Sequence, residues 1–182
     1  PDDLIPATSL TFEGLRNQYE RDGLGAELVA STSKKVVSMD NLEKPFNETP
    51  FMAITMIIRF PGDSLEEVLS TSQSVFTGYN PYDRSHVDMA GTQVPLSANF
   101  TSGYGLWLAR SGFATQSLLT LFGKGEPLEV PHVYLLQPYH PERHIVIMVH
   151  GLASSPEAWI NLANEVMGDE TLRQNYQIWQ IY

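Results

Sequence analysis

The chain has 182 residues, of which 42% are hydrophobic, enough to form the core of one ordinary domain or of a small domain with part of a second. Eleven basic against 21 acidic residues give a formal charge of -10, which repels phosphate backbones and argues against nucleic acid as a partner. No apolar run approaches the ~20 residues that span a bilayer, and the lack of cysteine excludes disulfides, thiolate nucleophiles and cysteine-ligated zinc.

Residues 1–128 are predicted to form a β-rich N-terminal region with at least one helix. Two glycines precede a strand in DGLGAELVA (22–30), and FMAITMIIRF (51–60) is apolar and β-branched, which favours a buried strand. The stretch 65–83 can begin as a strand or as a helix, and the Thr, Val, Phe and Tyr content of TSQSVFTGY favours a strand.

A hairpin and a helix follow. HVDMAGTQVPLSANF (86–100) alternates around a turn near Ala90-Gly91, and Pro95 restricts its second arm to an edge. Residues 101–125 then carry apolar side chains at helical spacing before Gly123 and Gly125, so at least one helix is expected there. Five aromatic residues could pack the N-terminal region against the rest or line an acyl pocket, and core packing is favoured: Tyr79, Tyr82, Phe100, Tyr104 and Trp107.

The pattern changes after residue 128, where residues 129–182 are predicted to begin a second domain. HVYLLQPY (132–139) indicates a half-exposed strand, and the continuously apolar HIVIMV (144–149) indicates a strand buried on both faces. A helix should follow, with one apolar stripe formed by Trp159, Leu162, Ala163, Val166 and Met167, and YQIWQIY (176–182) should be another strand. Residues 144–182 are thus a strand, helix, strand unit of the α/β class.

Chemistry is expected in the loop from His150 to Ser155, because ligands of open α/β sheets lie outside the carboxyl ends of the strands. Gly151 allows a ligand to approach the backbone, and the following helix N-terminus favours negative charge, so the loop suits an oxyanion. Ser154 and Ser155 are interpreted as helix caps and not as nucleophiles.

HIVIMVHGLASSPEAW (144–159), followed by the strand YQIWQIY, resembles the lipase and esterase members of the α/β-hydrolase superfamily. The resemblance implies an incomplete α/β-hydrolase sheet over 144–182. It also implies that the backbone N–H of Leu152 is one oxyanion-hole donor, with His150 and Gly151 in supporting roles.

No G-x-S-x-G occurs in the chain, and no histidine follows His150. Because the family's triad runs Ser, Asp or Glu, then His, the nucleophile, acid and histidine are expected in a C-terminal part that completes the sheet. The expected function is therefore the N-terminal part of a serine hydrolase acting on carboxylic esters or lipids, and the chain alone should be inactive. The alternative is a non-catalytic binding or assembly module that retains an α/β half-sheet.

No cofactor is implied, and the spacing of His140 and His144 gives no recognised metal motif. The resemblance suggests a bacterial enzyme of the cell envelope or periplasm, although composition leaves the compartment open.

Overall fold

The computed structural model describes residues 1–32, 46–111, 133–149, 151 and 156–181. The expectations for His150, Leu152, Ser154 and Ser155 lie outside these residues. So does the part of the expected helix beyond residue 111.

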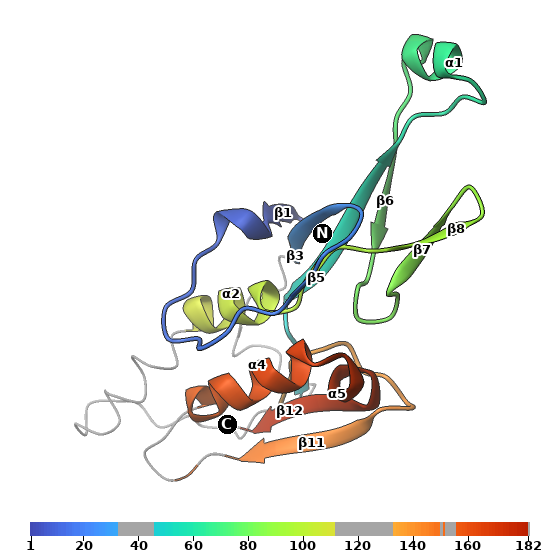
Figure 1. Cartoon of the computed structure of the whole chain (residues 1–182). Coiled ribbons are helices and arrows are strands. Elements are labelled where there is room, and N and C mark those ends of the chain that lie inside the picture. The colour runs from blue at the N-terminus through green and yellow to red at the C-terminus, as the bar shows by residue number, and fades with distance from the viewer. Residues whose placement is uncertain (33–45, 112–132, 150, 152–155, 182) are drawn as a thin grey trace.

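An antiparallel sheet in the order β1-β3-β5-β6 dominates the N-terminal half (Figure 1). Its strands are β1 (Asp3–Pro6), β3 (Ala26–Ser31), β5 (Phe51–Arg59) and β6 (Val75–Tyr79), and the short 3-10 helix η1 (Ala7–Ser9) follows β1. Along β5, buried residues alternate with less buried ones from Phe51 to Ile57. This alternation is typical of a strand with one face on the core.

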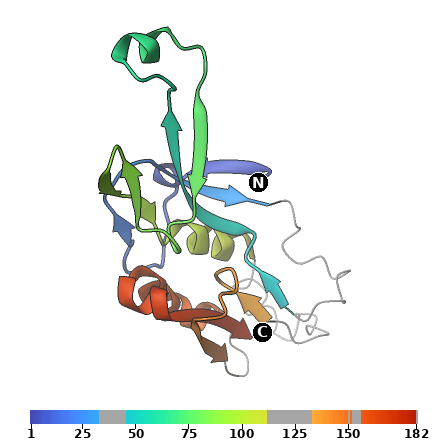
Figure 2. The ribbon, with the colours of Figure 1, turned by 90° about the vertical axis from the view of Figure 1, so that its right-hand side faces the viewer.

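β5 and β6 continue beyond the body of the molecule as an arm with helix α1 (Leu65–Ser70) at its tip (Figure 2). The start of residues 65–83, for which strand and helix were both possible, is therefore a helix that begins with a capping arrangement, and the strand favoured for TSQSVFTGY is confirmed by β6. The Ser64 side chain accepts a hydrogen bond from the Glu67 backbone N–H at 3.2 Å, and the Glu67 carboxylate accepts one from the Asp63 N–H at 2.7 Å.

The hairpin prediction is confirmed by β7 (His86–Met89) and β8 (Thr92–Pro95). Ala90 and Gly91 both have positive φ angles, 53° and 83°, as the tight turns of two-residue hairpins require. β9 (Ala98–Asn99) then pairs with β2 (Glu20–Arg21) before helix α2.

Helix α2 (Ser102–Ser111) lies between the N-terminal sheet and the C-terminal layer (Figures 1 and 2). Trp107 is 1% exposed and its ring contacts that of Tyr134 at a centroid distance of 5.5 Å. The core around it draws residues from both halves of the chain: Val29, Phe51, Tyr104, Leu106, Leu108, Leu136, Met148, Ala163, Met167 and Ile178. The packing role favoured for Phe100, Tyr104 and Trp107 agrees with their burial.

The C-terminal sheet has the order β11-β12-β10-β4. β11 (His144–Val149) runs parallel to β12 (Tyr176–Ile181), β12 is antiparallel to β10 (Val133–Leu135), and β10 is parallel to β4 (Phe46–Glu48). Between β11 and β12 the chain forms the 3-10 helix η2 (Pro156–Trp159) and helices α4 (Ile160–Gly168) and α5 (Glu170–Asn175). The individual strands and the helix expected in 144–182 are thus present.

The expected fold class, an incomplete α/β-hydrolase sheet, is nevertheless wrong. Strand accounts for 39% and helix for 26% of the described residues, so β structure dominates there, and it is divided among several small sheets. The physical reason is connectivity: within the described residues, helices join parallel neighbouring strands only between β11 and β12. Regular alternation of strand and helix does not extend to the rest of the chain.

Strand β11 also differs from its predicted burial on both faces. Within the described residues it pairs with β12 alone, which makes it an edge strand. Ile145, Ile147 and Val149 are 43%, 56% and 58% exposed, whereas Met148 on the other face is 3% exposed. β10 is shorter than the strand predicted over 132–139, and its Tyr134 and Leu135 are both buried rather than alternating.

Candidate functional site

The parallel pair β11 and β12 places the expected site. The two strands are in register over six residues, from His144 opposite Tyr176 to Val149 opposite Ile181. The chain leaves β11 at Val149 and returns to helical structure at Pro156, so the loop between them begins at the carboxyl end of a parallel pair. Ligands of parallel sheets bind at this end.

Of the residues expected at the site, the structure describes Gly151. It is exposed, and a Cβ atom added to it would meet no atom within 4 Å. Packing against the described residues therefore does not require glycine at this position. The expected approach of a ligand to Gly151 stays a prediction, together with the roles of Leu152 and His150.

Helix α4, which follows the loop, packs on the inner face of the C-terminal sheet. Ala163 and Met167 are fully buried and join the core with Met148 and Ile178, which fits the predicted apolar stripe. Leu162 departs from that stripe, because it is 49% exposed.

A polar network attaches α4 to the N-terminal segment. The buried Asn164 side chain accepts a hydrogen bond from Thr101 Oγ1 and donates one to the Asn17 backbone oxygen, each at 2.8 Å. At the next residue of the helix, the Tyr19 hydroxyl donates to the Glu165 carboxylate, which also accepts from Asn17 Nδ2 at 3.0 Å. These contacts hold the helix behind the loop in a defined position.

The same contacts shift two pKa values in opposite directions. The hydrogen bonds from Tyr19 and then Asn17 lower the pKa of the exposed Glu165 carboxyl. The Glu165 carboxylate is in turn the main cause that raises the pKa of the Tyr19 hydroxyl, and burial adds to it. The pair therefore favours ionised Glu165 with neutral Tyr19.

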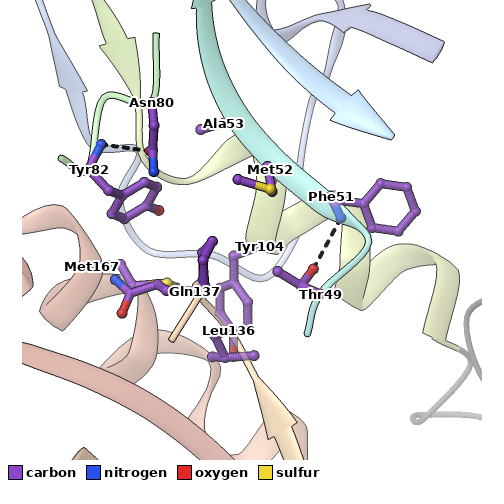
Figure 3. Close-up of a pocket in the computed structure, with 12 residues that line it drawn as sticks. Thr49, Phe51, Met52, Ala53, Asn80, Tyr82, Tyr104, Leu136, Gln137 and Met167 are labelled. Carbon is purple, nitrogen blue, oxygen red and sulfur yellow. Dashed lines mark hydrogen bonds between the residues drawn. The ribbon is translucent and has the colours of Figure 1, made fainter. Parts of the chain in front are cut away.

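A small cavity lies at the junction of the two sheets, lined by Met52, Tyr82, Gln137 and Met167 among others (Figure 3). Its volume is about 10 Å³, close to the minimum for a single water molecule. Gln137 is 2% exposed, and its amide nitrogen and oxygen have no hydrogen-bond partner among the described residues. The cavity suits one water molecule and is too small for an ester substrate.

A larger cleft that sequence reasoning missed contains three arginines, Arg21, Arg143 and Arg173. Its volume is about 360 Å³. The three residues are far apart in the sequence and follow no motif, so no local signal could have identified them.

Two other classes of site have no support in the described parts of the chain. Those parts contain no group of three or more His, Asp or Glu side chains placed to hold a metal ion. Their helices are also too short or too polar to cross a membrane.

Comparisons with known proteins leave the family open. No protein-family model matches the chain, and no significant match was found among curated proteins or solved structures.

Proposed function

We propose that the chain is the N-terminal part of a serine hydrolase that acts on carboxylic esters, lipids included. The observation that carries the proposal is the unit formed by β11, the loop after it, α4 and β12. Its two strands are parallel, so the loop lies at their carboxyl end. The serine, activated by histidine, attacks the ester carbonyl, and the Leu152 N–H donates a hydrogen bond to the oxyanion that forms. Leu152 lies outside the described residues, so its role rests on the elements on either side.

The open face of the C-terminal sheet supports a further polypeptide segment as partner. Ile145, Ile147 and Val149 form an exposed apolar row on β11, next to the partly buried Trp179 of β12. Within the described residues the outer edge of β11 has no neighbouring strand. Free strand edges and apolar faces favour association. A C-terminal part of the same protein that carries the nucleophile would cover both.

The test is ester hydrolysis by the product of the whole encoding gene. We expect a fluorophosphonate probe to label a serine beyond Tyr182, and p-nitrophenyl esters to be hydrolysed. Leu152→Pro removes the backbone donor and should lower kcat by about 10²–10³-fold. Leu152→Ala keeps the N–H and is the matched control. Labelling of Ser154 or Ser155, or a stop codon directly after Tyr182, would overturn the proposal.

The second candidate is the non-catalytic binding module, which the outer face of the N-terminal sheet favours. Alternate residues of its four strands give a continuous apolar face with a hollow of about 490 Å³, lined among others by Leu4, Ala26, Leu28, Met56, Ile58 and Phe76. Phe76 is 63% exposed and Ile58 is 49% exposed. Exposed apolar patches of this kind mark interaction sites. A gene product without fluorophosphonate labelling or esterase activity would select this candidate.

A further inference from the structure

The cleft with three arginines lies away from the proposed oxyanion loop. The turn at residues 81–85, the turn that precedes β11 and the end of helix α5 surround it. It is at the amino end of β11, whereas the loop follows the carboxyl end. Six strand residues separate the two, roughly 20 Å at about 3.3 Å per residue. The cleft is therefore a separate site.

Arg173 and Arg21 both pack on Phe100 at the wall of this cleft. The Arg173 guanidinium carbon lies 3.7 Å from the centre of the Phe100 ring, and that of Arg21 lies 5.4 Å from it. Arg173 Nη1 donates to the Gly168 oxygen at 2.7 Å, and Arg21 Nε donates to the Leu96 oxygen at 2.7 Å. Ring and backbone contacts thus fix the orientation of both guanidinium groups.

Neither of these two arginines has a carboxylate within ion-pair distance among the described residues, where the single ion pair joins Arg143 to Asp83 at 3.1 Å. Arg173 is only 4% exposed. Burial is the largest cause and lowers the pKa of Arg173; Glu170 is the next and raises it, and Arg21 then lowers it. A buried cation is normally paired with an anion.

The clustering is unusual for this chain. It has seven arginines and a net charge of -10, yet three of the seven line one cleft. The carboxylates in the lining are Asp83, already paired with Arg143, and Glu142. Among the side chains that line the cleft, three guanidinium groups thus face two carboxylates, and Glu170 and Asp169 lie near Arg173 outside the lining. A volume of about 360 Å³ is within the range of small-molecule sites, about 300–1,000 Å³.

We infer that this cleft binds a phosphate-bearing anion through Arg21, Arg143 and Arg173. Guanidinium groups form charge-assisted, often bidentate hydrogen bonds with phosphate. A phosphate monoester offers three acceptor oxygens, one for each guanidinium, whereas a carboxylate offers two. The phosphate belongs either to a small soluble ester or ion or to a lipid headgroup, and the two sources share this chemistry.

The test is an NMR titration of the ¹⁵N-labelled chain with inorganic phosphate at constant ionic strength. Saturable shifts are expected at the backbone amides of Ser85, Arg143 and Asn175, which line the cleft. Arg21→Gln should weaken the affinity by about tenfold or more, the loss of one charge-assisted hydrogen bond. Arg59→Gln removes the same charge on the projecting arm and should leave the affinity unchanged.

Circular dichroism checks that each variant is folded, and Arg21→Lys replaces Arg21→Gln if the latter unfolds. Failure of wild-type protein to show saturable shifts at these amides overturns the inference, as does equal weakening by Arg59→Gln. Cosedimentation with phosphatidylcholine vesicles containing phosphatidic acid then separates the sources. If the chain cosediments with these vesicles and Arg21→Gln prevents it, the phosphate belongs to a lipid headgroup. If the chain binds inorganic phosphate but does not cosediment, the ligand is a soluble anion. Because the readout is binding, it is independent of the proposed ester hydrolysis.

Discussion

Substitution of Gly168 by alanine tests how tightly α4 is attached to the N-terminal segment. A Cβ atom at Gly168 would lie 2.1 Å from Cγ, 2.3 Å from Cδ2 and 2.6 Å from Cδ1 of Tyr19. Cγ lies on the χ2 axis, so turning the ring about χ2 does not remove the overlap, and a change in χ1 would break the hydrogen bond from the Tyr19 hydroxyl to Glu165. The Tyr19 backbone is also held, because its N–H donates to Thr101 Oγ1 at 2.9 Å and its oxygen accepts from the Phe100 N–H at 2.8 Å. Either Tyr19 loses its hydrogen bond to Glu165, or the whole residue or the helix must move.

The expected magnitude follows from two opposing terms. Overpacking in a well-packed region costs about 1–3 kcal/mol, and overlap at three ring atoms places this case in the upper part of that range. Alanine gains up to about 1 kcal/mol over glycine in a helix. We therefore expect Gly168→Ala to lower the free energy of unfolding by about 1–2 kcal/mol. For a chain of this length this corresponds to a decrease in Tm of about 2–8 °C.

Urea unfolding of a double-mutant cycle with Tyr19→Ala is the assay. Without the ring the overlap disappears, so in the Tyr19→Ala background Gly168→Ala should be neutral or slightly stabilising, which gives a coupling of about 2–3 kcal/mol. Gly151→Ala is the control, because its Cβ would meet no atom within 4 Å and its effect should stay within about 0.5 kcal/mol. A Gly168→Ala variant as stable as wild type, or equally destabilised in both backgrounds, would refute the reasoning.

Three further predictions concern pH, the open sheet face and the hairpin. The folded-state pKa of Glu165 is lowered and that of Tyr19 is raised. Their contribution to stability should therefore fall both as pH drops below the ordinary glutamate value of about 4.3 and as it rises above the ordinary tyrosine value of about 10. In urea unfolding, Glu165→Gln should abolish the acid loss and reduce the alkaline loss, because burial also raises the pKa of Tyr19. In chemical denaturation, Ile147→Ala should lower the free energy of unfolding by less than about 1 kcal/mol and Met148→Ala by about 2–5 kcal/mol. Equal losses would contradict the observation that the Ile147 face of β11 is open. Ala90→Asn should stabilise the chain by about 0.5–1 kcal/mol, seen as a higher Tm, because asparagine tolerates the φ of 53° better than alanine; a lower Tm would count against the described turn.

Local patterns predicted local structure well. Alternation around Ala90-Gly91 predicted the hairpin, and the apolar runs predicted strands β11 and β12 with a helix between them. The sequence left helix α1 open between helix and strand, because strand-like composition after residue 70 follows the capping signal from Ser64 to Glu67. Such capping signals depend on single side chains and are easily outweighed by composition.

Burial and assembly were less predictable, because they depend on neighbours that the sequence does not specify locally. HIVIMV is continuously apolar, but apolarity alone does not say whether a strand has a covering layer, and one face of β11 is open. The arginine cleft arises from residues 21, 143 and 173, which only the tertiary fold brings together. The role of Leu152 in an oxyanion hole stays a prediction.

The pairing of β4 with β10, and of β10 with β12, has a consequence for synthesis of the chain. The first strand of this sheet ends at Glu48 and the last at Ile181, so 133 residues separate them. At about 5–20 residues per second, a ribosome needs about 7–27 s to make the intervening chain. The N-terminal sheet, which is complete at Tyr79, can form well before this, whereas β4 must wait for its partners. We therefore expect the C-terminal sheet to form last, and the nascent chain to expose the strand edge of β4 to chaperones until β12 leaves the ribosome.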